Sequence, residues 1–309
     1  MGDIELTEAR ADVLARYAPD ATARRCEWSR GETEVLEVGS GPPLLLVHGA
    51  LSDACVWLPI MWRLARDHHV FAVDLPGHGL ADPFDYTGVD MPVFGSTFLR
   101  DILDALHLPS TSIAANSMGG LWSVALALRE PERVTGLVLA GAPLGVNLSL
   151  PFPLRAAITV CRVPMMGQRL ARRMMTIPNR EADRKFWGQV LVVRPERLDE
   201  TLLDEDMASA RRNIESHLGL LAHFGDGGMA DARRRLNLGE GWQSLRTPTL
   251  FLWGERDRFF RGPGEGEALA ARNPSLRVTA IPDAGHIPWV DDPDAVVGGI
   301  EQHLASAPM

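Results

Sequence analysis

The stretch IAANSMGG, residues 113–120, places one serine among small residues. Ser117 has Ala115 two residues before it and Gly119 two residues after it. This small-x-Ser-x-Gly spacing is typical of a nucleophile on a sharp turn between a strand and a helix, where larger flanking side chains would clash with nearby backbone. A helix beginning near Met118 would direct its first N–H groups toward developing negative charge. We therefore predict that Ser117 is a nucleophile.

A serine hydroxyl needs a base, and His286 is the best placed of the nine histidines. His286 lies in the small-residue loop of PDAGHIPW, directly after the last apolar run. Asp257 follows the preceding apolar run, in LWGERD, and offers the carboxylate that an imidazolium requires. The order Ser117, Asp257, His286 is the one expected when the nucleophile occupies such a turn. Glu255, two residues before Asp257, is the alternative acid.

An oxyanion formed by attack of Ser117 also needs backbone donors. The segment LLLVHGALSDACVW, residues 44–57, offers one, because Gly49 allows a sharp turn after the apolar run and Ala50 can then face the serine. The second donor is the N–H of Met118, directly after the nucleophile. We predict an oxyanion hole formed by Ala50 and Met118.

Three further polar residues, Asp74, His48 and His78, lie in the same kind of loop. Asp74 occurs before the nucleophile in a turn-rich segment, DLPGHG, and this position favours a role in shaping the loop over a role as catalytic acid. His48 and His78 are interpreted in the same way, as residues that form hydrogen bonds within their loops.

Short apolar runs alternate with amphipathic stretches along most of the chain, which favours an α/β fold with a mostly parallel sheet. Each predicted strand ends in a loop: residues 42–49, 69–79, 111–120, 134–143, 247–257 and 276–286. Residues 54–66 and 119–131 are predicted helices, and residues 23–41 a leading antiparallel strand pair. Between about residues 143 and 244 the pattern is helical without a convincing strand, which indicates an insertion.

The motifs LLLVHG, DLPGHG, ANSMGG, LWGERD and AGHIPW, in this order and spacing, resemble those of the α/β-hydrolase family. The resemblance implies a mostly parallel eight-stranded sheet flanked by helices, with an inserted helical cap. It also implies the triad Ser117, Asp257 and His286, with Ala50 and Met118 as oxyanion donors. We divide the chain into a first core part at residues 1–143, a cap at 144–244 and a second core part at 245–309.

The serine at the turn favours hydrolysis of carboxylic esters of small to medium apolar substrates through an acyl-serine intermediate. The alternative is C–C bond hydrolysis, because NSMGG is similar to the elbow of meta-cleavage-product hydrolases. Three features oppose that alternative. The chain reads HGALSDACVW where those enzymes usually have a glycine-rich loop, and Ile287 directly follows His286, where they tend to carry tryptophan. Acidic Asp206 lies about where they carry a carboxylate-binding arginine. Either Arg211 or Arg212 could replace that arginine. A cofactor-free oxygenase or perhydrolase, or a ligand receptor, would fit the fold as well.

The composition limits the partners of the chain. A formal net charge of −9 argues against a nucleic-acid partner. The sequence contains no run of eighteen apolar residues, so we expect no stable membrane insertion. Three separated cysteines form no pair motif, which favours a reducing, cytoplasmic location. We expect a small-molecule substrate and no cofactor or metal; a homodimer is possible.

One part of the predicted cap is basic despite the acidic chain. Eight arginine or lysine residues but only two acidic ones occur between Pro151 and Lys185. We interpret this segment as a solvated helix face, with recognition of an anionic substrate or interface as the alternative.

Overall fold

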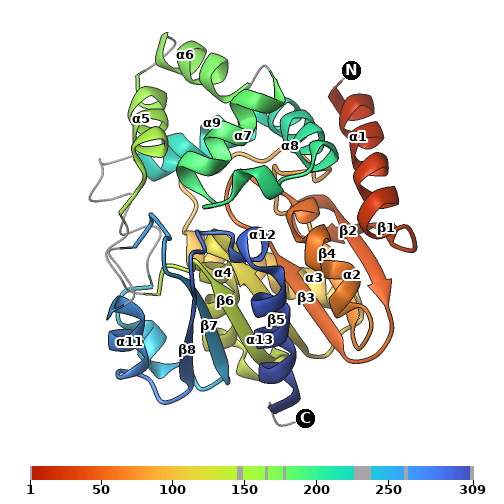
Figure 1. Cartoon of the computed structure of the whole chain (residues 1–309), viewed down its shortest axis with the longest axis vertical. Coiled ribbons are helices and arrows are strands. Elements are labelled where there is room, and N and C mark those ends of the chain that lie inside the picture. Colours follow the sequence, from red (N-terminus) through yellow and green to blue (C-terminus); the bar gives the residue numbers. More distant parts are fainter. Residues whose placement is uncertain are drawn as a thin grey trace.

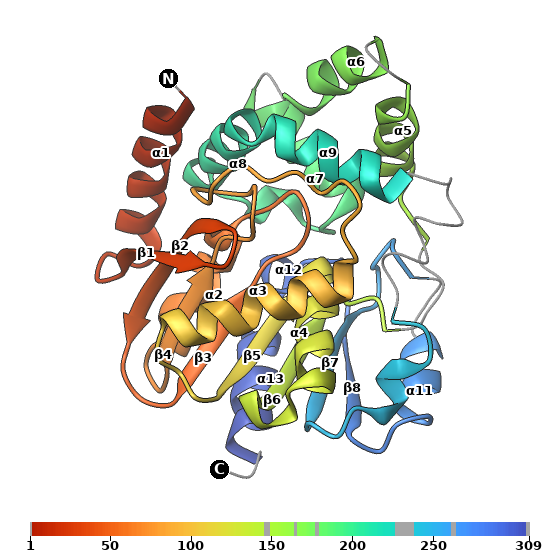
Figure 2. The same cartoon turned by 180° about the vertical axis from the view of Figure 1, so that it is seen from behind.

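A single mixed sheet of eight strands forms the centre of the molecule (Figures 1 and 2). The computed structural model describes residues 2–144, 149–163, 166–176, 179–225, 238–260 and 264–306. The strand order is β1-β2-β4-β3-β5-β6-β7-β8. β1 pairs antiparallel with β2 and β2 with β4, and all other neighbours are parallel. The strands are β1 Thr22–Trp28, β2 Gly31–Gly39, β3 Pro43–Val47, β4 His69–Val73, β5 Thr111–Asn116, β6 Val134–Ala140, β7 Thr249–Gly254 and β8 Leu276–Ile281.

Helices cover both faces of this sheet, which explains why its strands are apolar on both sides. Leu45 and Val47 of β3 pack in one core cluster, whereas Leu44 and Leu46 pack in the other. The first face carries α3 Met91–Ala105, α4 Ser117–Arg129 and α11 Gly264–Ala270. The second carries α2 Leu58–Leu64, α12 Pro288–Asp291 and α13 Pro293–Ser306. The predicted α/β fold is confirmed, including the leading antiparallel pair.

A further group of helices lies between β6 and β7 in the sequence. Together these helices cover one end of the strands of the sheet (Figures 1 and 2). They are α5 Phe152–Cys161, α6 Met166–Met175, α7 Arg180–Val190, α8 Glu200–Arg212 and α9 Ile214–Gly225. We call these five helices the cap. The residue boundaries that we assigned to it from the sequence stay a prediction.

The first helix, α1 Gly2–Tyr17, was not predicted from the sequence. It packs beside α8 of the cap (Figure 1). Only Leu6, Arg10 and Val13 of this helix are buried. An apolar face this narrow gives little periodic signal in the sequence. It also buries little apolar surface, so the stability of the helix depends on the contacts of Arg10.

Arg10 is a buried cation surrounded by carboxylates from four parts of the chain. Its Nη1 donates to Asp74 Oδ2 at 2.6 Å and to Glu34 Oε1 at 2.8 Å, and its Nε donates to Glu205 Oε1 of α8 at 3.2 Å. Asp53 Oδ1 lies 3.6 Å from Nη2. Burial raises the pKa of Glu205 well above its ordinary value, while the Arg10 guanidinium holds the pKa of Asp74 low against the opposing effect of burial. Arg10 thereby joins the N-terminal helix, the core and the cap.

Removing the Arg10 charge should therefore destabilise the whole chain. We expect Arg10→Met to lower the free energy of unfolding by about 3–5 kcal/mol, because buried carboxylates lose their partner. Arg16→Met is the matched control on the same helix. Arg16 pairs with Asp199 but its side chain is 57% exposed, so its loss should cost about 1 kcal/mol or less. Urea titrations followed by tryptophan fluorescence measure both values, and equal losses would contradict this account of α1.

Candidate active site

Ser117 lies at the junction where β5 ends and α4 begins, as the sequence predicted. Its backbone φ is 50°, in the left-handed region that non-glycine residues seldom adopt. Strain of this kind persists where the surrounding structure enforces it, and such residues cluster at functional sites. The sharp turn exposes the serine side chain at the carboxyl end of the sheet, where open parallel sheets bind ligands.

Two glycines make room for this turn. A Cβ on Gly119 would lie 2.4 Å from the carbonyl oxygen of His48 and 2.7 Å from that of Val47. A Cβ on Gly49 would lie 2.9 Å from the Cβ of Ser117. All three distances are below the closest approach that real Cβ atoms show, so the β3 and β5 loops meet only because these side chains are absent.

The imidazole of His286, beside this turn, is held by the side chains of Asp257 and Phe259. Its Nδ1 forms a hydrogen bond of 2.8 Å with Asp257 Oδ2, and both side chains are almost fully buried. The other Asp257 oxygen, Oδ1, accepts from the N–H of Phe259 at 2.9 Å. The Phe259 ring stacks on the imidazole with centroids 3.9 Å apart. Glu255, the alternative acid, is exposed. An aspartate so placed selects the His286 tautomer that has its second nitrogen, Nε2, free to act as a base.

Asn116, directly before Ser117, connects the strand that ends at Ser117 to the histidine loop. Its Nδ2 donates to the carbonyl of Ala140 on β6 and to the carbonyl of His286, both at 2.9 Å. One amide group therefore sets the position of the His286 backbone relative to the strand that ends at Ser117.

Asp291 is a second positioning residue that sequence reasoning missed. Its carboxylate accepts from the N–H of Gly285 at 2.8 Å and from the N–H groups of Val193 and Arg194, at 3.0 and 2.7 Å, on the segment after α7. The histidine loop is thus attached to the cap. The local sequence WVDDP does not distinguish Asp291 from an ordinary acidic residue in the first turn of a helix. Only the folded structure shows its positioning role.

The predicted oxyanion donors lie at the same place. Ala50 and Met118 line one cavity together with Ser117 and His286. The N–H of Ala50 has no acceptor among the residues that the structure describes. Met118 lies in the first turn of α4, where N–H groups have no acceptor within the helix. The assignment of these two N–H groups as oxyanion donors stays a prediction.

The loop residues Asp74, His48 and His78 form hydrogen bonds within their loops, as predicted, and they also join the loop after β3 to the loop after β4. Asp74 accepts from the N–H groups of Ala54 and Leu80, each at 2.8 Å. His48 Nε2 accepts from the N–H of Leu75 at 2.8 Å and His78 Nε2 from that of Leu51 at 3.2 Å. Burial lowers the pKa of His48 to about 4 and that of His78 to about 3, so both rings are neutral acceptors at neutral pH.

The cavity above Ser117 is about 90 Å³, several times the space one water molecule needs, and most of its wall is apolar. The cap supplies much of this wall: Leu150, Leu154, Ile158, Phe186, Trp187, Val190, Leu191, Leu221 and Phe224. No arginine or lysine is among the described lining residues. An apolar cavity of this kind suits an uncharged substrate.

Asp206 is the one carboxyl group among the described residues of that wall. The Nε1–H of Trp187 donates to its Oδ2 at 3.1 Å. Burial raises the pKa of the neighbouring Asp183 to about 7, and burial together with Asp183 raises the pKa of Asp206. Arg211 and Arg212 do not reach this wall, because they pair with Glu5 and Asp3 of α1.

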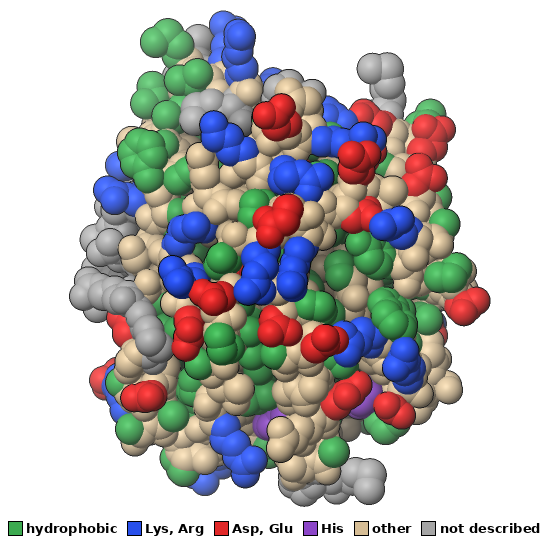
Figure 3. Space-filling view, in the orientation of Figure 1, with side chains coloured by type: hydrophobic (Ala, Val, Ile, Leu, Met, Phe, Trp, Pro, Cys, Tyr) green, Lys and Arg blue, Asp and Glu red, His purple; other side chains and the backbone are tan. Residues whose placement is uncertain are grey.

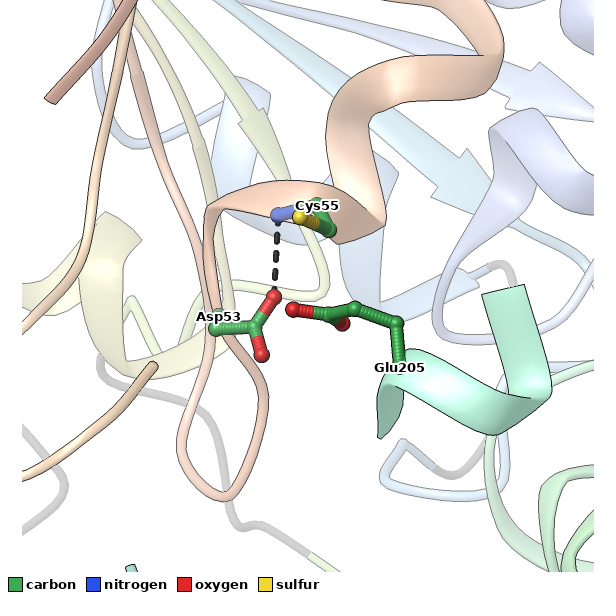
Figure 4. Close-up of side chains that lie close together, drawn as sticks. All are labelled: Asp53, Cys55 and Glu205. Carbon is green, nitrogen blue, oxygen red and sulfur yellow. Dashed lines mark hydrogen bonds between the residues drawn. The ribbon is translucent and has the colours of Figure 1, made fainter. Parts of the chain in front are cut away.

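One cluster outside the cavity has the composition of a metal site. Ligand atoms of Asp53, Cys55 and Glu205 lie within 4.8 Å of one another, and Figure 4 shows the two carboxylates facing each other, with Asp53 bonded to the Cys55 N–H. The guanidinium of Arg10 already places positive charge beside both carboxylates. We therefore assign the cluster a structural role.

Comparison with known proteins agrees with the fold. The model of the alpha/beta hydrolase family matches residues 44–298. A pimeloyl-acyl carrier protein methyl ester esterase from Xanthomonas campestris pv. campestris is 29% identical over 88% of this chain and 98% of its own length. The 2-hydroxy-6-oxononadienedioate/2-hydroxy-6-oxononatrienedioate hydrolase from Cupriavidus pinatubonensis is 30% identical over 82% of this chain and 80% of its own length. The structure of the carboxylesterase CesB from Bacillus subtilis has a TM-score of 0.75 at 17% identity and covers 99% of both chains.

The fold and these relatives define a hydrolase. The chain belongs to the alpha/beta hydrolase family. None of its described helices combines the length and the apolar character that a bilayer-spanning segment requires.

The close packing at Gly119 can be tested by adding one methyl group. We expect Gly119→Ala to lower the free energy of unfolding by about 1–3 kcal/mol, because the new Cβ meets backbone that cannot move away. Gly298→Ala in α13 is the control, since no atom lies within 4 Å of its added Cβ. The control should gain about 0.5–1 kcal/mol from helix propensity. A neutral or stabilising Gly119→Ala in a urea titration would contradict the proposed tightness of the turn.

Proposed function

We propose that this chain is a serine hydrolase that cleaves carboxylic esters of small to medium apolar substrates through an acyl-serine intermediate. The observation that carries the proposal is the left-handed Ser117 opening, together with His286 and the two backbone donors, into one apolar cavity. The names of the esterase from Xanthomonas campestris and the carboxylesterase from Bacillus subtilis support an ester as substrate.

In the proposed reaction, His286 Nε2 takes the proton from Ser117 Oγ as that oxygen attacks the ester carbonyl carbon. The carbonyl oxygen becomes an oxyanion that accepts from the N–H groups of Ala50 and Met118. His286 then protonates the departing alcohol, which leaves an acyl group on Ser117. Finally His286 takes a proton from water, the hydroxide attacks the acyl carbon, and the proton returns to Ser117 as the acid departs.

Hydrolysis of a C–C bond in a dienoic keto acid is the second candidate, supported by the relative from Cupriavidus pinatubonensis, whose name specifies dioate substrates. A dioate brings carboxylates into the site. Because the described cavity wall contains no arginine or lysine and Arg211 and Arg212 pair with α1, such a substrate would lose water without gaining a counter-charge there. We therefore favour the uncharged ester.

The effect of Asp257 on His286 can be separated from the effect of losing one negative charge near the site. We expect Asp257→Asn to lower kcat by about 10⁴-fold, because an amide no longer selects the His286 tautomer that accepts the Ser117 proton. Glu255→Gln changes the net charge equally, two residues away, and should retain wild-type kcat. The measurement is steady-state hydrolysis of p-nitrophenyl butyrate, with circular dichroism as the check on folding. Equal loss in both variants, or loss only in Glu255→Gln, would refute the assignment of Asp257.

Substrate charge separates the two candidate functions. We expect neutral p-nitrophenyl hexanoate to exceed the p-nitrophenyl half-ester of adipic acid in kcat/KM by about 100-fold or more, because the free carboxylate must be buried unpaired. A dienoic keto acid such as 2-hydroxy-6-oxohepta-2,4-dienoate should not be cleaved. If this acid is turned over while both esters stay intact, the C–C hydrolase candidate is the correct one.

A further inference from the structure

The outer helices of the cap, α5 and α6, expose apolar side chains to an extent seen nowhere else in the described residues. Seven large hydrophobic residues are exposed among all the described residues, and four of them lie between residues 152 and 170. Phe152 and Met166 are each 78% exposed, Leu170 is 51% exposed and Val163 is 50% exposed. Hydrophobic side chains gather in this region in the upper left of Figure 3. A contiguous exposed apolar group of this kind marks a contact surface.

The same two helices carry positive charge without compensation from their own sequence. From Arg133 to Arg180 the chain contains no aspartate or glutamate, although its net charge is −9. Five exposed arginines lie on or directly after α5 and α6: Arg155, Arg162, Arg169, Arg172 and Arg173. Arg172 pairs with Glu215 of α9, and the other four form no ion pair with a described residue. We call these five arginines with Phe152, Val163, Met166 and Leu170 the α5–α6 face.

The inner side of α5 reaches the candidate active site. Leu154 and Ile158 line the cavity above Ser117, whereas Phe152 and Arg155 are exposed on the outer side of the same helix. Figures 1 and 2 place α5 and α6 at the outer end of the cap, away from the sheet. One helix therefore separates the apolar cavity from the α5–α6 face.

We propose that the α5–α6 face binds reversibly to the surface of a lipid bilayer rich in anionic phospholipids. Phe152 and Met166 would enter the boundary between headgroups and acyl chains, while the arginines pair with lipid phosphates. Binding of this kind is peripheral and needs no spanning segment. It would bring the cavity close to a medium that dissolves apolar esters.

The charge pattern favours this occupant over a second copy of the chain. A two-fold interface brings the same surface of both copies together. The α5–α6 face of one copy would then meet the five arginines of the other, and like charges would repel across a partly apolar interface. A flat anionic surface complements every arginine at once and also accepts the apolar side chains.

Co-sedimentation with vesicles tests the proposal. We expect binding to vesicles of equimolar phosphatidylcholine and phosphatidylglycerol, little binding to phosphatidylcholine alone, and loss of binding as salt screens the arginines. The triple variant Arg155→Gln/Arg169→Gln/Arg173→Gln should bind about 100-fold more weakly, since each arginine near such a surface contributes about fivefold. Arg129→Gln/Arg246→Gln/Arg277→Gln removes the same charge from exposed residues elsewhere and should bind as the wild type does.

The apolar contribution has its own pair of variants. Phe152→Ser/Met166→Ser should weaken vesicle binding about tenfold or more, whereas Ile4→Ser/Trp62→Ser, at exposed residues outside the α5–α6 face, should not. Turnover of water-soluble p-nitrophenyl acetate checks that each variant is folded. Equal binding by test and control variants would overturn the proposal. So would absence of vesicle binding, or a concentration-dependent dimer in sedimentation velocity that Phe152→Ser/Met166→Ser dissolves. If the chain hydrolyses esters but binds no vesicles, this inference fails and the proposed reaction stands. If it binds vesicles but hydrolyses no ester, the proposed reaction fails and this inference stands.

Discussion

The close approach of backbone around Ser117 is the constraint on which the other features of the site depend. The serine can hold its left-handed φ of 50° only while the β3 and β5 loops touch, and they touch because Gly49 and Gly119 lack side chains. This contact places the Ala50 loop beside the first turn of α4. Ala50 and Met118, from different segments, thereby line one cavity with Ser117. Preorganised N–H donors at such a place would need no reorganisation when charge develops there.

The second half of the site is attached to this turn by polar side chains. Asn116 joins β5 to the carbonyl of His286, and Asp257 fixes the imidazole. Asp291 attaches the histidine loop to the segment after α7. The cap is also joined to the N-terminal helix through Arg10 and Glu205. The cavity wall is therefore held by buried, directional contacts on two sides, although the cap interrupts the core between β6 and β7.

Local patterns in the sequence were enough to predict the strands and Ser117, Asp257 and His286 as candidate residues. Each strand of the parallel core is a short apolar run, and each candidate residue follows such a run in a small-residue loop. α1 could not be predicted in this way, because its buried face contains a charged residue whose partners, Glu34, Asp74 and Glu205, are distant in the chain. Asn116 and Asp291 were missed for the same reason: their acceptors and donors are backbone groups that only the folded chain brings near. The orientation of Arg211 and Arg212 toward α1 likewise depended on a helix that was not foreseen.

The central claim is that Ser117 is the activated nucleophile of this hydrolase, and its covalent capture tests that claim most directly. Treating the folded chain with a fluorophosphonate and locating the adduct by peptide mass spectrometry should give stoichiometric modification of Ser117. Modification should slow by orders of magnitude when Asp257 no longer orients His286. An adduct on another serine, or no adduct on a chain that hydrolyses esters, would contradict the account.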